Sequence, residues 1–487
     1  MFAQALDILT SRRGRLILTW LVLLAAIGHR CVQGWINFEV PERPDGNDGH
    51  TSIDFGGQWM MGRLLVLGHG RELYSRSKHL EVAREGFRQE RETADSHDHD
   101  AERLVGWYVG LPTDAVGGPL YPPVHAFVMA PFGLISNPYW SYRVAQAFML
   151  GCVFIAGLGV RYMTNGRWWW SAATAFLLLF PGCRGGIDLA QNSTVTVMLL
   201  IWGWALLVRG RPGWGGLIWG LLAFKPVWAL SFLFALLLLR QWRASLTMCA
   251  TGAGLVLLTI PFVGIQSWFD WLHIGSLAAE AYQTDRNWIF LSRDLFGITR
   301  RMFLDFEDGR ALENKPIAGY SGWALWGVVA GTTILLAIRK RRGTSLEGIY
   351  PAMILLGAFL CAYRFMYYDA MIAVLGAIVL MADPRPFFRK AWWPFASWSS
   401  ILVGMLLLVE NATAPLNVDV TANVGGLKRT VVAADDTTEK VAPKFYVGSG
   451  DYYPWDTVVV IWLWAWCGAR LVRRRNQAST DSEQGER

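Results

Sequence analysis

One carboxylate in this chain is placed where acid–base chemistry could occur. Asp54 follows the first long apolar run, which extends from Leu16 to about Ile36. Such a run is long enough to cross a bilayer, and because Arg12 and Arg13 precede it, the positive-inside rule assigns the N-terminus to the cytoplasm. Asp54 is therefore expected at the outer membrane surface, where its carboxylate can take a proton from a hydroxyl group of a lipid-borne substrate.

The residues after Asp54 indicate how it is held. They form an apolar stripe at helical spacing, which is typical of an amphipathic helix lying on a membrane, with Asp54 near its N-terminus. A carboxylate in an exposed loop is more often only solvated, and that alternative stays open. The stripe consists of Trp59, Met60, Met61, Leu64, Leu65 and Leu67.

Lys225 is a candidate phosphate ligand. It lies between two apolar runs and is followed by Pro226. A lone cation is costly inside a membrane unless its side chain snorkels to the interface, which is the structural interpretation. In the functional interpretation, which the adjacent proline favours, Lys225 holds an anionic lipid phosphate as a compact point charge.

Polar residues near two other apolar segments are candidates for lining a cleft. Gln191 and Asn192 precede an apolar run, and amides at membrane depth generally face a cavity or one another. Asn192 could instead cap a helix. Tyr121 is followed by two prolines, which fix the backbone. It therefore lies either in a rigid lead-in to the next apolar segment or in the wall of a cleft.

The outer segment 265–320 adds Asn287 and Arg293 as candidates. An arginine can bind a phosphate bidentately. A salt bridge from Arg293 to Asp294 or Asp285 is the commoner outcome for such an arginine, so both interpretations are kept.

The junction 363–369 contains Arg364, Tyr368 and Asp369 between two apolar runs. It is expected at the outer face. Arg364 and Asp369 either pair with each other or flank the cleft.

Composition predicts an all-α polytopic membrane protein. Hydrophobic residues make up 53% of the chain, and the 17% of charged residues is well below the roughly 25% of soluble domains. The net charge of +7 comes from basic residues spread over short loops, so no nucleic acid partner is expected. The six cysteines have no paired spacing, which predicts neither a disulfide framework nor a metal site.

Arginine-rich turns define the expected inner face. With these turns inside, the chain has about twelve crossings, two cytoplasmic termini and a single transmembrane domain over residues 1–475, followed by a disordered tail at 476–487. Long stretches at 37–120, 265–320 and 411–455 fall outside, so chemistry is expected at the outer face. The predicted spans are 16–36, 142–160, 168–182, 193–208, 213–224, 226–239, 244–264, 322–338, 347–363, 367–382, 394–410 and 456–472.

Two segments do not fit this pattern simply. Residues 121–135 are apolar but contain three prolines, so the segment either crosses the membrane or is re-entrant. Residues 76–105 form a charged insertion in which Asp and His alternate from 95 to 100. Such a run could hold a metal, but the high polarity without regular spacing favours a solvated loop.

The order of these features resembles glycosyltransferase family 87 of the GT-C superfamily, the type that depends on polyprenyl-phosphate-mannose. The resemblance extends from about residue 16 to residue 382. Ala190 stands where the family tends to have glycine, the insertion after Tyr74 is unusual, and 363–369 lacks the expected serine–proline and tryptophan–histidine signals. The motifs that carry the resemblance are Ile53-Asp54-Phe55 with Gly68 and Leu73-Tyr74, Leu120-Tyr121-Pro122-Pro123 with Ala130-Pro131, Ala190-Gln191-Asn192, and Gly220 to Lys225-Pro226.

The resemblance implies a GT-C-like bundle with outer-face amphipathic helices in the inner membrane. It further implies an inverting transfer of a sugar, typically mannose, from a polyprenyl-phosphate donor to a lipid or glycan acceptor, with no metal or other cofactor. Asp54 would be the general base, and the leaving phosphate would be stabilised by Lys225, Arg293 and Arg364. The residues expected to line the cleft are Tyr121, Gln191, Asn192, Asn287, Tyr368 and Asp369.

Two other functional classes are compatible with a polytopic protein. A lipid or glycan transporter or flippase would place charges midway along several spans and would show repeated halves. No obvious repeat is present, and the polar motifs cluster towards one face. A polymerase or ligase of lipid-linked glycans would place paired arginines in a large outer loop. The segment 265–320 could supply these with Arg286, Arg293, Arg300 and Arg301.

Overall fold

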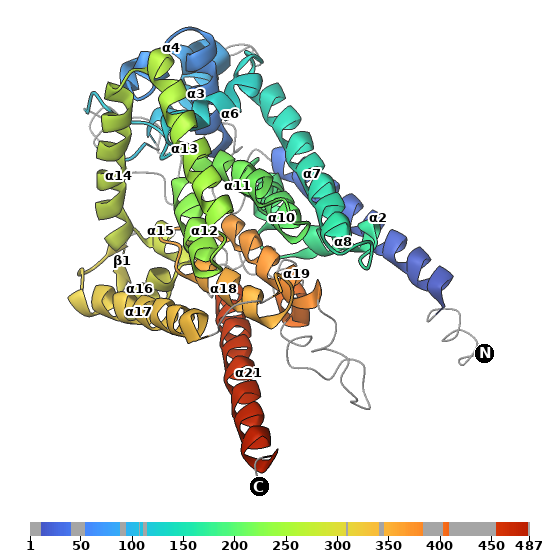
Figure 1. Cartoon of the computed structure of the whole chain (residues 1–487). Coiled ribbons are helices and arrows are strands. Elements are labelled where there is room, and N and C mark those ends of the chain that lie inside the picture. The colour runs from blue at the N-terminus through green and yellow to red at the C-terminus, as the bar shows by residue number, and fades with distance from the viewer. Residues whose placement is uncertain are drawn as a thin grey trace.

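The computed structural model confirms an all-α polytopic membrane protein (Figure 1). The described part also contains one short antiparallel hairpin, formed by β1 (Phe306–Glu307) and β2 (Arg310–Ala311). The predicted span 394–410 lies mostly outside the described residues, as do Asn411 and most of the predicted outer loop 411–455. The structure describes residues 11–39, 54–87, 94–106, 108–110, 114–307, 310–339, 345–382, 403–408 and 454–485.

Two groups of helices make up the fold. The apolar helices of the main bundle are α2 (Arg12–Glu39), α7 (Pro138–Met163), α8 (Trp170–Leu179), α10 (Ser193–Val208), α11 (Pro212–Gly220), α12 (Pro226–Leu238), α13 (Trp242–Val263), α17 (Pro316–Arg339), α18 (Ile349–Leu360), α19 (Val374–Ala382) and α21 (Trp455–Gly485). The other helices are α3 (Asp54–Val66), α4 (Arg76–Phe87), α5 (Ala94–Gly106), α6 (Pro123–Gly133), α9 (Cys183–Asp188), α14 (Gln266–Thr284), α15 (Arg286–Leu291) and α16 (Leu295–Phe303), with 3-10 turns η2 (Gly70–Glu72), η3 (Leu221–Phe224) and η4 (Tyr367–Ala373).

Only some of the predicted spans are long continuous helices. Within the described residues, five helices are long and apolar enough to cross a membrane: α2, α7, α13, α17 and the first part of α21. The predicted spans at 168–182, 226–239 and 347–363 are shorter helices, and 213–224 is α11 followed by η3. Helix α21 continues to Gly485, into the segment for which the sequence predicts a disordered tail.

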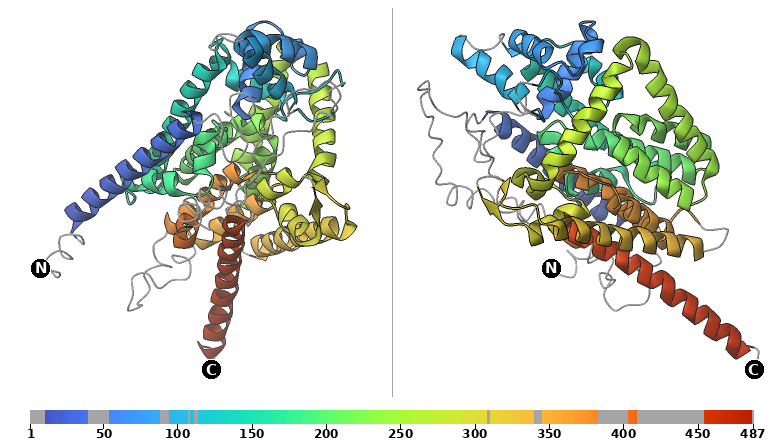
Figure 2. Two further views of the ribbon diagram at one scale, coloured as in Figure 1. Left: turned by 180° about the vertical axis from the view of Figure 1, so that it is seen from behind. Right: turned by 90° about the vertical axis from the view of Figure 1, so that its left-hand side faces the viewer.

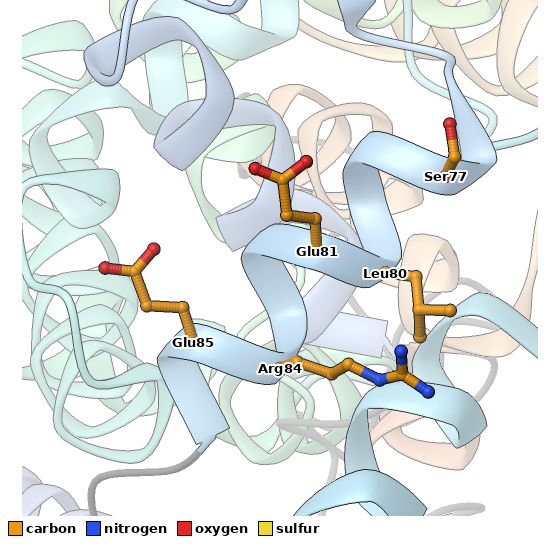
Figure 3. Close-up of a pocket in the computed structure, with 5 residues that line it drawn as sticks. All are labelled: Ser77, Leu80, Glu81, Arg84 and Glu85. Carbon is orange, nitrogen blue, oxygen red and sulfur yellow. The ribbon is translucent and has the colours of Figure 1, made fainter.

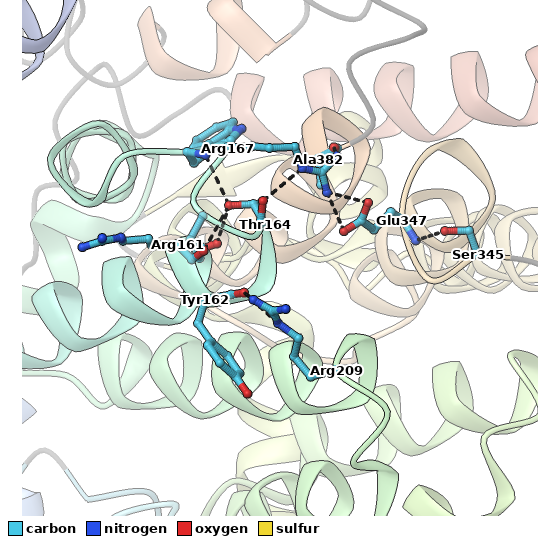
Figure 4. Close-up of polar contacts among 10 residues, drawn as sticks. Arg161, Tyr162, Thr164, Arg167, Arg209, Ser345, Glu347 and Ala382 are labelled. Atoms are coloured by element: carbon cyan, nitrogen blue, oxygen red, sulfur yellow. Dashed lines mark hydrogen bonds and ion pairs between the residues drawn. The ribbon is translucent and has the colours of Figure 1, made fainter.

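Basic residues gather where the bundle helices turn at one end. Arg167, which follows α7, donates to both carboxylate oxygens of Glu347 (2.7 Å each) and to the carbonyl of Ala382 (2.6 Å) at the end of α19. Arg209, which follows α10, donates to the carbonyl of Tyr162 at 3.0 and 2.5 Å (Figure 4). Turns that the sequence assigns to the inner face therefore lie together at one end of the bundle.

The first and last bundle helices point the same way. Figure 2 shows that α2 and α21 extend beyond the rest of the molecule, and that the N-terminal end of α2 and the C-terminal end of α21 lie at the same end. Helices α3, α4 and α6 lie at the opposite end. This arrangement agrees with two termini on one side of a membrane.

Helix α3 is buried, so the prediction of an amphipathic helix lying on the membrane is wrong. Its residues from Phe55 to Gly62 are all buried, and it packs against α6 and α4. The α3 and α6 backbones approach closely, because a Cβ at Gly62 would lie 2.2 Å from the carbonyl oxygen of Met129. Other protein segments therefore cover Trp59, Met60, Met61 and Leu64 of the stripe that the sequence assigned to lipid, whereas Leu65 is half-buried and Leu67 is exposed.

The length of helix α6 distinguishes between the two alternatives for the proline-containing segment 121–135. It has 11 residues and so rises about 17 Å, roughly half the hydrocarbon thickness of a bilayer. Pro131 lies inside the helix. The segment is too short to cross as a single span, which favours the re-entrant alternative.

The charged insertion contains helices, so the prediction of a solvated loop is wrong for its described part. Val82, Phe87 and Leu104 are buried in the apolar cluster that includes α3, and Arg84 of α4 lies 3.5 Å from Glu102 of α5. The apolar residues of α4 and α5 are few and are separated by many charged residues, so the sequence did not show a helical pattern. Figure 3 shows the outer face of α4, where a shallow hollow is lined by Ser77, Leu80, Glu81, Arg84 and Glu85.

Buried His79 predicts that this α4–α5 unit is sensitive to acid. Burial lowers the pKa of His79 to about 4; its Nε2–H donates to the carbonyl of Leu73 (2.7 Å), and the Tyr108 hydroxyl donates to Nδ1 (2.5 Å). Because the unfolded chain has the ordinary pKa of roughly 6.5, the stabilisation is complete above that pH and is lost as pH falls from 6.5 towards 4. We expect the melting temperature in detergent to fall more steeply over this range for wild type than for His79→Gln. Parallel curves would contradict this expectation.

Candidate active site

Five segments that are distant in the sequence meet in one polar network. They are the start of α3, the start of α6, the turn between α9 and α10, the junction between η3 and α12, and η4. All five are helix ends or turns. Irregular backbone at membrane depth is tolerated where it is buried in protein or lines a cavity. The short helices α10 and α12 begin directly after residues of the network, and α19 begins directly after η4.

The carboxylate side of the network is built on Asp54. This residue is the first of α3 and is half-buried, and Gln191 Nε2 donates to its Oδ1 at 3.3 Å. The Tyr121 hydroxyl donates to Gln191 Oε1 at 2.6 Å. The structure therefore brings together three residues that the sequence singled out.

The cationic side of the network is built on Lys225. Its Nζ donates to Asp369 Oδ1 at 2.6 Å and to Asn192 Oδ1 at 2.8 Å, and it lies 5.6 Å from the ring centroid of Tyr368. The Asp369 residue is only 3% exposed. Asp369 thus pairs with Lys225, which corrects the alternative in which it pairs with Arg364.

Two buried residues that the sequence analysis missed connect these two sides. Gln58 donates through Nε2 to the carbonyl of Ala190 (3.2 Å) and to Gln191 Oε1 (3.4 Å), and its Oε1 accepts from Asn192 Nδ2 (3.5 Å). His125 Nε2 lies 3.2 Å from the same Oε1. A usable signal existed, because Gln58 comes four residues after Asp54 and so lies on the same face of a helix.

The backbone conformation at Ala190 explains why glycine is expected at this position. Its φ is +47°, in the left-handed region where glycine has no steric penalty. Alanine tolerates this conformation at a small cost, so the turn forms although the expected glycine is absent. The same residue supplies the carbonyl that accepts from Gln58.

The remaining predicted residues lie outside the described network. Arg364 Nη2 donates to the Tyr363 hydroxyl (2.8 Å) and to the carbonyl of Ala279 (3.2 Å), and its guanidinium lies over the ring of Tyr282. Asn287 lies in α15, but its side chain is outside the described residues. Neither residue is connected to Lys225 by a described hydrogen bond.

Arg293 holds the segment 265–320 to the C-terminal helix α21, and Arg301 makes hydrogen bonds within that segment. Arg293 Nε pairs with Asp456 Oδ2 of α21 at 3.0 Å, so a salt bridge forms, with a different partner from the two considered above. Arg301 Nη2 donates to the carbonyls of Phe290 and Ser292 at 2.6 Å each. These contacts give both arginines structural roles, and Arg293 is not needed to build the site.

The network lies at the opposite ends of its helices from the basic turns. Asn192 directly precedes α10 and Lys225 directly precedes α12, and these helices end before Arg209 and Arg240. With 16 and 13 residues they rise about 24 and 20 Å, less than the roughly 30 Å hydrocarbon core. If the basic turns mark the inner boundary, the network lies just below the outer one.

Within the described residues, no group of three or more His, Cys, Asp or Glu side chains is arranged to hold a metal ion. The side chains of residues 94–99, which include most of the alternating Asp and His run, lie outside that description. The network itself offers one carboxylate beside Lys225 and another, Asp54, beside an amide. Its groups are suited to proton transfer and to anion binding.

The fold defines a membrane-embedded protein, in which a polar network lies at helix ends. Residues 120–349 match the model of glycosyltransferase family 87, in agreement with the resemblance found in the sequence. The match includes Tyr121, Gln191, Asn192 and Lys225, whereas Asp54 and Asp369 lie outside it. No curated protein and no solved structure matches the chain.

Proposed function

We propose that this protein transfers a sugar, mannose by the family resemblance, from a polyprenyl-phosphate donor to a hydroxyl group of a lipid or glycan acceptor. One observation carries the proposal: the half-buried carboxylate of Asp54 and the half-buried ammonium group of Lys225 belong to a single hydrogen-bonded network. The first suits proton removal from an alcohol, and the second suits a phosphate leaving group.

The proposed step is a single displacement. Asp54 accepts the proton of the acceptor hydroxyl as its oxygen attacks the anomeric carbon of the sugar. The bond between that carbon and the phosphate oxygen breaks, and the electron pair leaves with the polyprenyl phosphate. The configuration at the anomeric carbon is inverted because attack and departure occur on opposite faces. The donor already carries its leaving group, so the step draws no energy from a nucleotide.

Lys225 would receive the phosphate. Its ammonium group has three donors. In the structure two of them are used, on Asp369 and Asn192, which leaves one for a phosphate oxygen. Negative charge on the leaving phosphate increases during bond breaking, so this donor would stabilise the transition state more than the bound donor substrate. Arg364, which the sequence also proposed as a phosphate ligand, instead donates to the Tyr363 hydroxyl and to the carbonyl of Ala279.

The placement of the network supports an outer-face site with a membrane-borne donor. The positive-inside rule assigns the basic turns to the cytoplasm, and the network is at the other ends of α10 and α12. These short helices leave it just within the hydrocarbon region, at a depth that suits a phosphate attached to a polyprenyl chain. We therefore propose an inner-membrane enzyme whose site opens outwards.

A transfer assay tests this function. Purified protein in lipid vesicles is incubated with radiolabelled polyprenyl-phosphate-mannose and a membrane lipid extract, and labelled product is separated by chromatography. We expect label to move from the donor to an extractable lipid or glycan. If label stays on the donor with mannose, and also with other polyprenyl-phosphate sugars, the proposed function is wrong. Movement of intact donor between vesicle leaflets would instead indicate the transporter alternative.

A further inference from the structure

We infer that Gln58 and His125 are positioning residues that set the direction of the hydrogen bonds reaching Asp54 and Lys225. This inference rests on the proposed function. Neither side chain needs to touch a substrate, because both are fully buried. They act through the amides of Gln191 and Asn192, which contact the two groups proposed for chemistry.

The backbone carbonyl of Ala190 fixes the orientation of the Gln58 amide. A carbonyl oxygen can only accept, so the atom 3.2 Å from it must be Gln58 Nε2. Gln58 Oε1 then faces the opposite way, towards His125 and Asn192. The amide cannot turn over without placing two acceptor oxygens against each other in a buried site, which is costly.

His125 secures this orientation from the other side. Because Gln58 Oε1 only accepts, His125 Nε2 must carry the proton and donate. The ring also stacks on Tyr121, with centroids 4.1 Å apart and an angle of 16° between planes.

The orientation of the Gln58 amide determines the orientation of the Gln191 amide, which contacts Asp54. Gln58 Nε2 and the Tyr121 hydroxyl both donate to Gln191 Oε1, so Gln191 Nε2 is left to face Asp54 Oδ1. A turned-over Gln191 would present its oxygen to the carboxylate and repel it. The arrangement therefore keeps a donor on one oxygen of Asp54 and orients the carboxylate for an incoming hydroxyl group.

Gln58 also determines the orientation of the Asn192 amide, which contacts Lys225. Asn192 Nδ2 donates to Gln58 Oε1, so Asn192 Oδ1 faces Lys225 Nζ. This oxygen and Asp369 Oδ1 both accept hydrogen bonds from the ammonium group. One buried glutamine thus coordinates the orientation of both chemical groups.

Three variants test this role. Gln58→Met keeps length and volume without hydrogen bonds, His125→Phe keeps the ring stack without the donor, and His125→Gln restores a donor. We expect the first two to lower kcat about tenfold to a hundredfold, the range found for residues that orient the ligands of metal sites. The donor KM should change less than about threefold, because orientation affects the transition state more than binding. His125→Gln should recover most of the loss.

A matched control separates positioning from stability. Gln146 is another buried glutamine, and it donates to the carbonyl of Asp188 at 3.4 Å without reaching Asp54. Gln146→Met should keep kcat within about twofold of wild type. Wild-type kcat in both Gln58→Met and His125→Phe would overturn the inference. Equal losses in His125→Phe and His125→Gln would overturn the donor role of His125.

A double variant distinguishes this inference from the proposed function. If Gln58 orients Asp54, Gln58→Met should cause a smaller loss of kcat in an Asp54→Asn background than in wild type, because the effects of interacting residues are not additive. The loss that remains reflects the Lys225 side of the network. Additive losses would overturn the inference while leaving the function intact. Wild-type transfer by Asp54→Asn itself would instead show that the proposed mechanism is wrong.

Discussion

Asp54→Asn is expected to lose at least about a hundredfold in kcat, the usual scale for removal of a general base. Asparagine has nearly the same shape but cannot take a proton. It can still accept from Gln191, whose Nε2 lies 3.3 Å from Asp54 Oδ1. The fold should therefore persist, with a melting temperature within a few degrees of wild type. Initial rates of sugar transfer, at saturating donor and acceptor, measure the effect.

Asp270 provides a matched control for this variant. It is also a partly exposed carboxylate that accepts from a glutamine amide, with Gln266 Nε2 at 2.8 Å, but it lies on α14 outside the network. We expect Asp270→Asn to retain wild-type transfer. If Asp54→Asn retains it as well, Asp54 is not the base.

Lys225→Met is expected to lower both transfer and stability. Removal of the ammonium leaves Asp369, which is 3% exposed, as an unpaired buried charge, and breaking a buried pair typically costs about 3–5 kcal/mol. Loss of one preorganised donor to a developing negative charge should reduce kcat about a hundredfold or more. Thermal unfolding and transfer rates measure the two effects separately.

A double variant separates binding of the phosphate from support of the fold. Lys225→Met with Asp369→Asn removes both charges, so we expect stability to return towards wild type. Transfer should remain low if the ammonium stabilises the leaving phosphate. Recovery of both stability and transfer would show that the Lys225–Asp369 pair is only structural.

The sequence could predict much of the site because membrane physics restricts polar residues. Lys225, Gln191 and Asn192 stand beside long apolar runs, and polar groups there are costly unless they serve a cavity or one another. Arginine-rich turns predicted which helix ends lie together, and Arg167, Glu347 and Ala382 meet as expected. Both inferences use local sequence only.

The missing parts depend on contacts between distant segments. The apolar stripe after Asp54 could face lipid or protein, and only the close approach of α6 at Gly62 shows that it faces protein. Arg293 pairs with Asp456, which is 163 residues away, so no local pattern could name that partner. The partners of Gln58 likewise come from α6 and the turn before α10, so its spacing from Asp54 could indicate the residue but not its contacts.

The most direct measurement is the anomeric configuration of the transferred sugar. Substitution at Asp54 abolishes both a base and a nucleophile, whereas stereochemistry distinguishes the two roles. With a donor of defined configuration, NMR of the product should show the opposite configuration, as a single displacement assisted by Asp54 requires. A product that keeps the donor's configuration would indicate a covalent sugar–enzyme intermediate and would contradict the role of Asp54 as a base.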